Sequence, residues 1–355
     1  MKLNSDGARR RMKQSLAAVA AAVLLAACGG GDRSSDFSPV RVIAFGDESS
    51  VLDDSAEAGN ARKYSVNPVF SDTVNCHINP NWTQHVASAY GLYFPECSKS
   101  LAAGTPTPSL MLAVPDADVA GVTAQIDAFL AGNTLGSQDL VTVYVGVHDV
   151  LDQYAAVKAG GDQAAALAAV GEAGTALATQ GNRLGGAGGR TVRAVGEAAT
   201  RWPTQASGPG DPAGRIIVAF LPGLHHTPFA AAEELAEPGA GRPALLQLLT
   251  TQFNDKVALG VYNDGTRIGV VQFDDTVRVV SEEPLGYGYV SPSNRGACLP
   301  ANRGANLLSC TTSTVVPEAV GDTQRWLWAD DTHLSAQGQL SLGQLALRLA
   351  TENPF

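Results

Sequence analysis

The stretch VRVIAFGDESSVLDD, from Val40 to Asp54, decides the fold that this chain is expected to adopt. It begins with an apolar, partly β-branched run at residues 40–45, which ends at Gly46-Asp47, and polar residues follow at once. This pattern predicts a buried strand that ends at a loop where side chains become exposed. In open α/β sheets, binding and reacting groups gather at such strand ends. We therefore expect chemistry directly after residue 46.

Three further apolar runs have the length of buried strands: Leu140 to Val145, Ile216 to Leu221 and Ile268 to Phe273. Apolar residues at helical spacing occur at Trp82 to Tyr90, at Val119 to Ala131, after Pro243 and after Ser335, and an Ala-rich segment from Ala155 to Arg183 is also expected to be helical. Strands that alternate with helices predict a central parallel sheet covered on both faces, which is a three-layer α/β/α fold.

One segment interrupts this pattern, from residue 184 to residue 214. It is rich in Gly, Pro, Arg and Thr and has no sustained period, so we interpret it as a surface insertion. The sequence does not distinguish a lid from a passive loop there. We expect the rest of residues 39–355 to form one domain, because a single α/β domain often reaches this length.

The first residues have the organisation of an export signal. A basic patch at residues 9–13 precedes an apolar run at residues 16–27, which is too short to span a bilayer. The sequence Leu-Ala-Ala-Cys at residues 25–28 resembles the bacterial lipobox, which implies cleavage after residue 27 and a lipid on Cys28. An uncleaved anchor or a buried helix is the alternative, and Met12 is an alternative start.

These features predict a lipoprotein signal at residues 1–27 and a Gly- and Ser-containing flexible tether at residues 28–38. The lipid on Cys28 would anchor the protein to a membrane of the cell envelope. No Asp follows Cys28, which favours the outer membrane by resemblance to enterobacterial sorting.

The charge of the chain limits its partners. The formal net charge is −10 at pH 7, and removal of the basic residues 1–27 makes it more negative. An acidic surface disfavours nucleic acid and anionic lipid headgroups as partners. Nothing in the sequence indicates the oligomeric state.

Four cysteines remain once Cys28 carries a lipid. Their even number in an oxidising envelope predicts two disulfides, and three connectivities are open. We favour Cys76 with Cys97 and Cys298 with Cys310, which close the shortest loops. Zinc binding by these cysteines is a weaker interpretation, because no CxxC spacing occurs.

Residues 45–50, FGDESS, resemble the first block of the GDSL family of ester hydrolases, also called SGNH hydrolases. In that family a strand leads into Gly-Asp-Ser, and the serine is the nucleophile. Here Gly46 and Asp47 match, Glu48 stands at the serine position, and Ser49 and Ser50 follow.

Further family blocks occur in the same order. Residues 146–149 resemble Gly-x-Asn-Asp, whose Asn helps to hold the oxyanion; Gly146 matches and His148 replaces the Asn. Asp330 and His333 match the Asp-x-x-His block before the last helix. The Gly of the remaining oxyanion element aligns with Asp116, and segments 221–228 and 284–298 also resemble parts of the family.

The resemblance implies the flavodoxin-like SGNH fold and hydrolysis of carboxylic esters of lipids or acylated small molecules, without a cofactor. With Glu48 in the serine position, we expect Ser49 to take the nucleophile role through a one-residue shift of the turn. His333 would be the general base, Asp330 would orient it, and His148 would lie near the oxyanion.

Two alternatives to the esterase stay open. One is a catalytically inactive lipoprotein that binds a ligand, and the other is a metal-dependent variant. In the latter case carboxylates and imidazoles of Glu48, Asp116, His148, Asp330 and His333 would converge. An open cleft with Ser49 near His333 would indicate an enzyme, whereas Glu48 filling that space would indicate a binding protein.

Overall fold

The computed structural model of this chain describes residues 37–186, 214–263, 265–290, 294–352 and 355. The predicted signal at residues 1–27, Cys28 and nearly all of the tether lie outside the described residues. So does most of the predicted insertion, at residues 187–213. Within the described residues, no helix combines the length and apolar character needed to cross a membrane.

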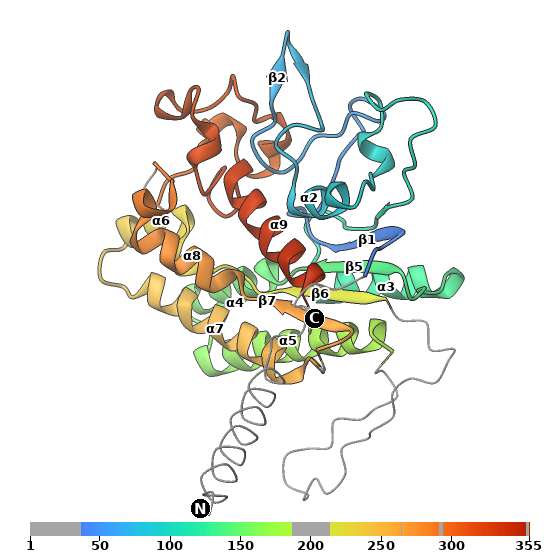
Figure 1. The fold of residues 1–355 in the computed structure, drawn as a ribbon. Coiled ribbons are helices and arrows are strands. Elements are labelled where there is room, and N and C mark those ends of the chain that lie inside the picture. Colours follow the sequence, from blue (N-terminus) through green and yellow to red (C-terminus); the bar gives the residue numbers. More distant parts are fainter. Residues whose placement is uncertain (1–36, 187–213, 264, 291–293, 353–354) are drawn as a thin grey trace, which may run out of the picture.

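A five-stranded parallel sheet forms the centre of the fold (Figure 1). In spatial order its strands are β4 (Leu110–Met111), β1 (Arg41–Gly46), β5 (Asp139–Tyr144), β6 (Arg215–Ala219) and β7 (Ile268–Val271). The four predicted strands are present within two residues at each end. The additional edge strand β4 has only two residues, too few to give a pattern in the sequence.

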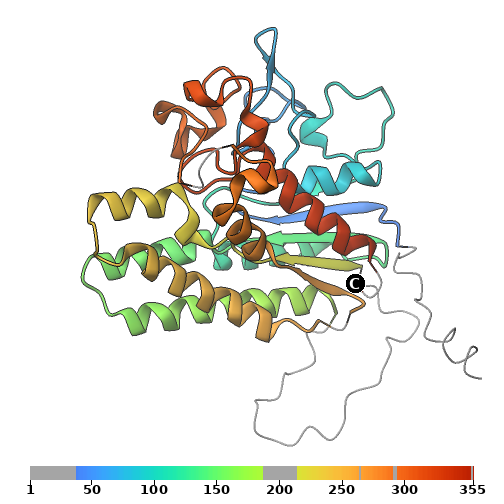
Figure 2. The same cartoon turned by 60° about the vertical axis from the view of Figure 1, so that its left-hand side comes forward.

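Helices cover both faces of this sheet (Figures 1 and 2). On one face lie α2 (Trp82–Ala89) and α9 (Ala336–Thr351), which pack against each other, and on the other lie α3 (Val119–Gly132), α4 (Val147–Lys158), α5 (Gln163–Leu184) and α7 (Arg242–Gly260). Two further helices, α6 (Pro228–Ala236) and α8 (Phe273–Glu282), complete the fold. The predicted three-layer α/β/α class is therefore confirmed.

The Ala-rich segment is helical as predicted, and it belongs to two helices. α4 and α5 are separated at Gly160, which has φ +97°, and Asp162 begins α5 by accepting a hydrogen bond from the N–H of Ala165. One boundary prediction is wrong. The last strand ends at Val271, and Phe273 instead begins α8. Phe273 is fully buried, and a short apolar run looks the same in a strand and in a buried helix.

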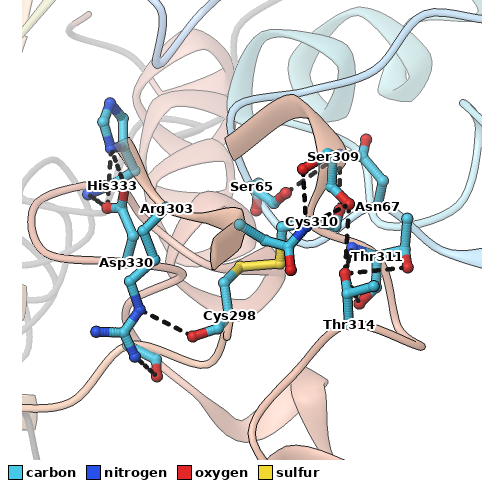
Figure 3. Close-up of a disulfide and its surroundings, with 12 residues drawn as sticks. Ser65, Asn67, Cys298, Arg303, Ser309, Cys310, Thr311, Thr314, Asp330 and His333 are labelled. Atoms are coloured by element: carbon cyan, nitrogen blue, oxygen red, sulfur yellow. Dashed lines mark hydrogen bonds and ion pairs between the residues drawn. A yellow bond between two sulfur atoms is a disulfide. The ribbon is translucent and has the colours of Figure 1, made fainter. Parts of the chain in front are cut away.

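A smaller second core lies above the carboxyl ends of the strands. It includes Val66, Leu307, Trp326 and the disulfide between Cys298 and Cys310 (Figure 3). The other disulfide joins Cys76 to Cys97, so both pairings are those favoured from loop length. This second core positions residues 328–333, because backbone N–H groups at 297 and 298 donate to the carbonyls at 328 and 329.

Candidate active site

The loop after β1 begins with a conformation that only glycine adopts readily. Gly46 has φ +149°, and a Cβ there would lie 2.3 Å from the carbonyl oxygen of Tyr144 on β5. The turn then closes on itself, since Asp47 Oδ1 accepts the N–H of Ser49 at 2.9 Å and the Asp47 carbonyl accepts the N–H of Ser50. This turn presents the Glu48 side chain at the carboxyl edge of the sheet.

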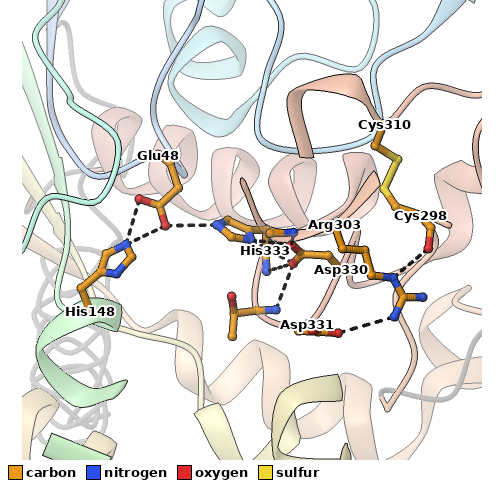
Figure 4. Close-up of polar contacts among 10 residues, drawn as sticks. Glu48, His148, Cys298, Arg303, Cys310, Asp330, Asp331 and His333 are labelled. Carbon is orange, nitrogen blue, oxygen red and sulfur yellow. Dashed lines mark hydrogen bonds and ion pairs between the residues drawn. A yellow bond between two sulfur atoms is a disulfide. The ribbon is translucent and has the colours of Figure 1, made fainter. Parts of the chain in front are cut away.

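The Glu48 carboxylate is the centre of the site (Figure 4). His148 Nε2 lies 2.9 Å from Oε1 and 3.0 Å from Oε2, and His333 Nε2 lies 3.0 Å from Oε1. The backbone N–H of Asp116 donates to Oε2 at 3.0 Å. The Glu48 side chain is only 6% exposed, so these contacts replace water as its partners.

His333 is oriented from its other side by Asp330. His333 Nδ1 lies 2.9 Å and 3.0 Å from the two carboxylate oxygens of Asp330. The backbone N–H groups of Thr332 and His333 also donate to Asp330 Oδ1, and that of Gly304 donates to Oδ2. The structure thus forms the Asp-His pair that the sequence predicts, with Nε2 directed at Glu48.

His148 lies in the first turn of α4. Gly146 caps this helix with φ +124°, and a Cβ there would lie 2.3 Å from the ring of Phe253. Asp149 accepts the first N–H of α3, at Val119. The Gly146 position thus requires glycine for close packing, while His148 faces the site from the start of the helix.

Asp116 has a backbone conformation that favours glycine. Its φ is +59°, in the left-handed region where non-Gly residues are uncommon, although Asp and Asn tolerate it best. The N–H of Asp116 points into the site. Here that N–H binds Glu48.

The two serines of the loop have different surroundings. Ser50 Oγ accepts a hydrogen bond from Trp82 Nε1, and its carbonyl accepts one from the Asn81 side chain. The Ser49 N–H donates to Asp47 Oδ1, and the Ser49 carbonyl accepts a hydrogen bond from Gln339. The role of Ser49 as nucleophile therefore stays a prediction.

Charge alternates along the chain of contacts from His148 to Asp330. The hydrogen bond to Glu48 raises the pKa of His148 to about 9. Burial alone would lower the pKa of His333, but the charge of Asp330 and the bonds to Asp330 and Glu48 raise it to about 10. Burial also opposes ionisation of Glu48, yet the two imidazoles hold its pKa below the usual range. Both imidazoles are therefore cationic at neutral pH.

Two glutamines that the sequence analysis did not identify hold the loop. Gln125 on α3 accepts the N–H of Gly46 and donates to its carbonyl, and Gln339 on α9 binds the Ser49 carbonyl. Gln339 is 2% exposed. In the sequence, a polar residue on the otherwise apolar face of the last helix was the feature that could have identified Gln339.

The comparisons with known proteins concern the fold alone. No protein-family model and no curated protein matches this chain. Among solved structures, a member of the lipolytic G-D-S-L family from Veillonella parvula aligns over 86% of this chain and 96% of its own, with 11% identity and TM-score 0.38. An acetyl xylan esterase variant from Geobacillus stearothermophilus aligns over 87% and 94%, with 11% identity and TM-score 0.41. An extracellular lipase from Streptomyces rimosus aligns over 86% and 97%, with 17% identity and TM-score 0.38.

Proposed function

We propose that this chain is an esterase-like protein that binds a ligand at the carboxyl edge of the sheet and does not hydrolyse it through a serine nucleophile. One observation carries the proposal: the Glu48 carboxylate binds His333, His148 and the N–H of Asp116 at once. By resemblance, these are the general base and both oxyanion donors of the GDSL family. Glu48 therefore occupies the position of the reacting ester.

Serine catalysis needs a hydroxyl within about 3 Å of an imidazole that can accept its proton. Here the His333 Nε2 atom already pairs with an anion, and that pairing favours the imidazolium. A bound ester would also have to displace Glu48 from the donors that stabilise its developing charge.

The donor set indicates the class of ligand. Two imidazolium groups and one backbone N–H match a carbonyl or carboxylate oxygen, which an acyl ester or its acid product presents. Such a ligand would exchange with the Glu48 carboxylate. We further propose that the protein acts at the cell envelope, anchored through a lipid on Cys28 in the outer membrane. Incorporation of an alkyne-labelled fatty acid by wild type but not by Cys28→Ala would support the anchor.

The test of the proposed function is gain of activity. Glu48→Ser restores the family's nucleophile beside an intact Asp330–His333 pair, so it is expected to hydrolyse p-nitrophenyl acetate and butyrate at least ~100-fold faster than wild type. The double variant with His333→Ala should lose this gain. Wild type should be no faster than His333→Ala alone.

A second candidate is an active esterase that uses Ser49. The position of Ser49, directly after Glu48 in the loop that follows β1, favours it. Hydrolysis by wild type that both Ser49→Ala and His333→Ala abolish would establish this function and overturn the binding proposal.

A further inference from the structure

Three departures from the GDSL pattern converge in space. Glu48 stands in the position of the serine, Asp116 in that of a glycine and His148 in that of an asparagine. One ligand atom from each of these three residues lies within 4.8 Å of the other two. They come from the loop after β1, the loop before α3 and the first turn of α4. All three replacements introduce side chains that bind metal ions.

We infer that Glu48, Asp116 and His148 bind one divalent transition-metal ion, with Zn²⁺ as the best match. Binding of the ion displaces the proton from His148 Nε2, so that two carboxylates and one neutral imidazole balance its charge. They supply the nitrogen and oxygen donors that Zn²⁺ takes at about 2.0–2.2 Å. Sites with three protein ligands keep a further position for water or a ligand oxygen. Asp116 is exposed and Glu48 is buried, so the group lies at the border between solvent and interior.

Other contacts in the site form an outer shell. His333 binds Glu48 Oε1, and Asp330 in turn binds His333 Nδ1, so this pair orients a ligand carboxylate. Outer-shell partners of this kind usually contribute 10–100-fold to metal affinity. Asp330 and His333, which would activate a serine nucleophile in the GDSL family, thus act here as positioning residues for Glu48.

A competing site exists at His225 and His226. Their rings stack with centroids 3.9 Å apart, and buried nitrogens of both have no hydrogen-bond partner within the described part of the chain. No carboxylate completes a group of three ligands there in the described residues. This pair therefore serves as the control for adventitious binding.

The experiment is calorimetric titration of the chelator-treated full chain with Zn²⁺. Wild type should bind one ion that Glu48→Gln, Asp116→Asn and His148→Ala each weaken at least 100-fold. Asp116→Asn removes the carboxylate and preserves the backbone, because Asn also tolerates the left-handed conformation. Asp330→Asn should weaken binding about 10–100-fold, and His225→Ala should have no effect. Circular dichroism of each variant checks the fold.

Loss of binding in His225→Ala with full binding in Glu48→Gln would overturn the inference, as would the absence of saturable binding in wild type. Binding is measured without an ester, so its result does not depend on the proposed function. Failure of the Glu48→Ser activity test leaves this titration unchanged.

Discussion

His333 Nε2 lies 3.0 Å from Glu48 Oε1, so the imidazole expected to act as a general base is bonded to a buried carboxylate. The same carboxylate also binds His148 through both of its oxygens. The Glu48 carboxylate thereby favours the cationic form of two histidines that lie 100 and 285 positions away in the sequence.

These protonation states can be measured by NMR titration of the histidine ring protons in chelator-treated protein. His148 and His333 should remain cationic at pH 8, given pKa values of about 9 and about 10. In Glu48→Gln, the pKa of His148 should fall by about 1–3 units, because its opposite charge is removed. The pKa of His333 should fall less, since the negative charge of Asp330 remains beside it. A titration of either ring near pH 6.5 in wild type would contradict this arrangement.

Gly146→Ala should destabilise the protein by about 1–3 kcal/mol, because its Cβ would overlap the ring of Phe253. Gly104→Ala is the matched control: Gly104 also has positive φ, at +87°, but no atom lies within 4 Å of an added Cβ. Urea unfolding of both variants separates the backbone cost from the packing cost. Equal losses in the two variants would show that Phe253 moves away freely.

Removal of the Cys298–Cys310 disulfide by a double Cys→Ser substitution should cost about 3 kcal/mol, as expected for closing a loop of this length. The effect should reach the site, because the N–H of Cys298 donates to Ala329 beside Asp330. Urea unfolding gives the loss of stability, and the His333 ring resonance reports on the site. An unchanged resonance would limit the role of this disulfide to the second core.

Because of Lys63, we expect the free energy of unfolding to rise with pH. Burial lowers the pKa of its ammonium to about 7, whereas the unfolded value is about 10.4. Below pH 7 both states hold the proton and the full cost of burial is present. Between pH 7 and 10 the unfolded state binds more protons, so stability rises by up to about 1.4 kcal/mol per pH unit.

The check is urea unfolding at pH 7 and pH 9 for wild type and Lys63→Met. The difference in stability between the two proteins cancels the contribution of the other titrating groups. The Lys63 ammonium donates to the carbonyls of Cys76 and Ile78, and Met leaves both carbonyls without this donor, so the change with pH is compared and not the absolute stability. Parallel changes with pH in the two proteins would show that Lys63 keeps its proton when folded.

The sequence by itself determined the fold class and the ends of the strands where the site lies. Buried parallel strands read as continuous apolar runs, and amphipathic helices show their period, so both signals are local. The Asp330–His333 pair was also predictable, since its two members are three residues apart. The break at Gly160 and the helix that begins at Phe273 were not recognised, because local apolar patterns do not fix element boundaries.

Only the tertiary structure decided what Glu48 does. Its partners come from three distant segments, and the directions of side chains across a sheet edge are set by packing and by backbone conformation, such as the φ values of Gly46 and Asp116. Sequence could place Glu48, Asp116 and His148 near one edge. The distances that join them in one charged cluster, and leave the Ser49 hydroxyl outside it, follow from long-range contacts that no local pattern encodes.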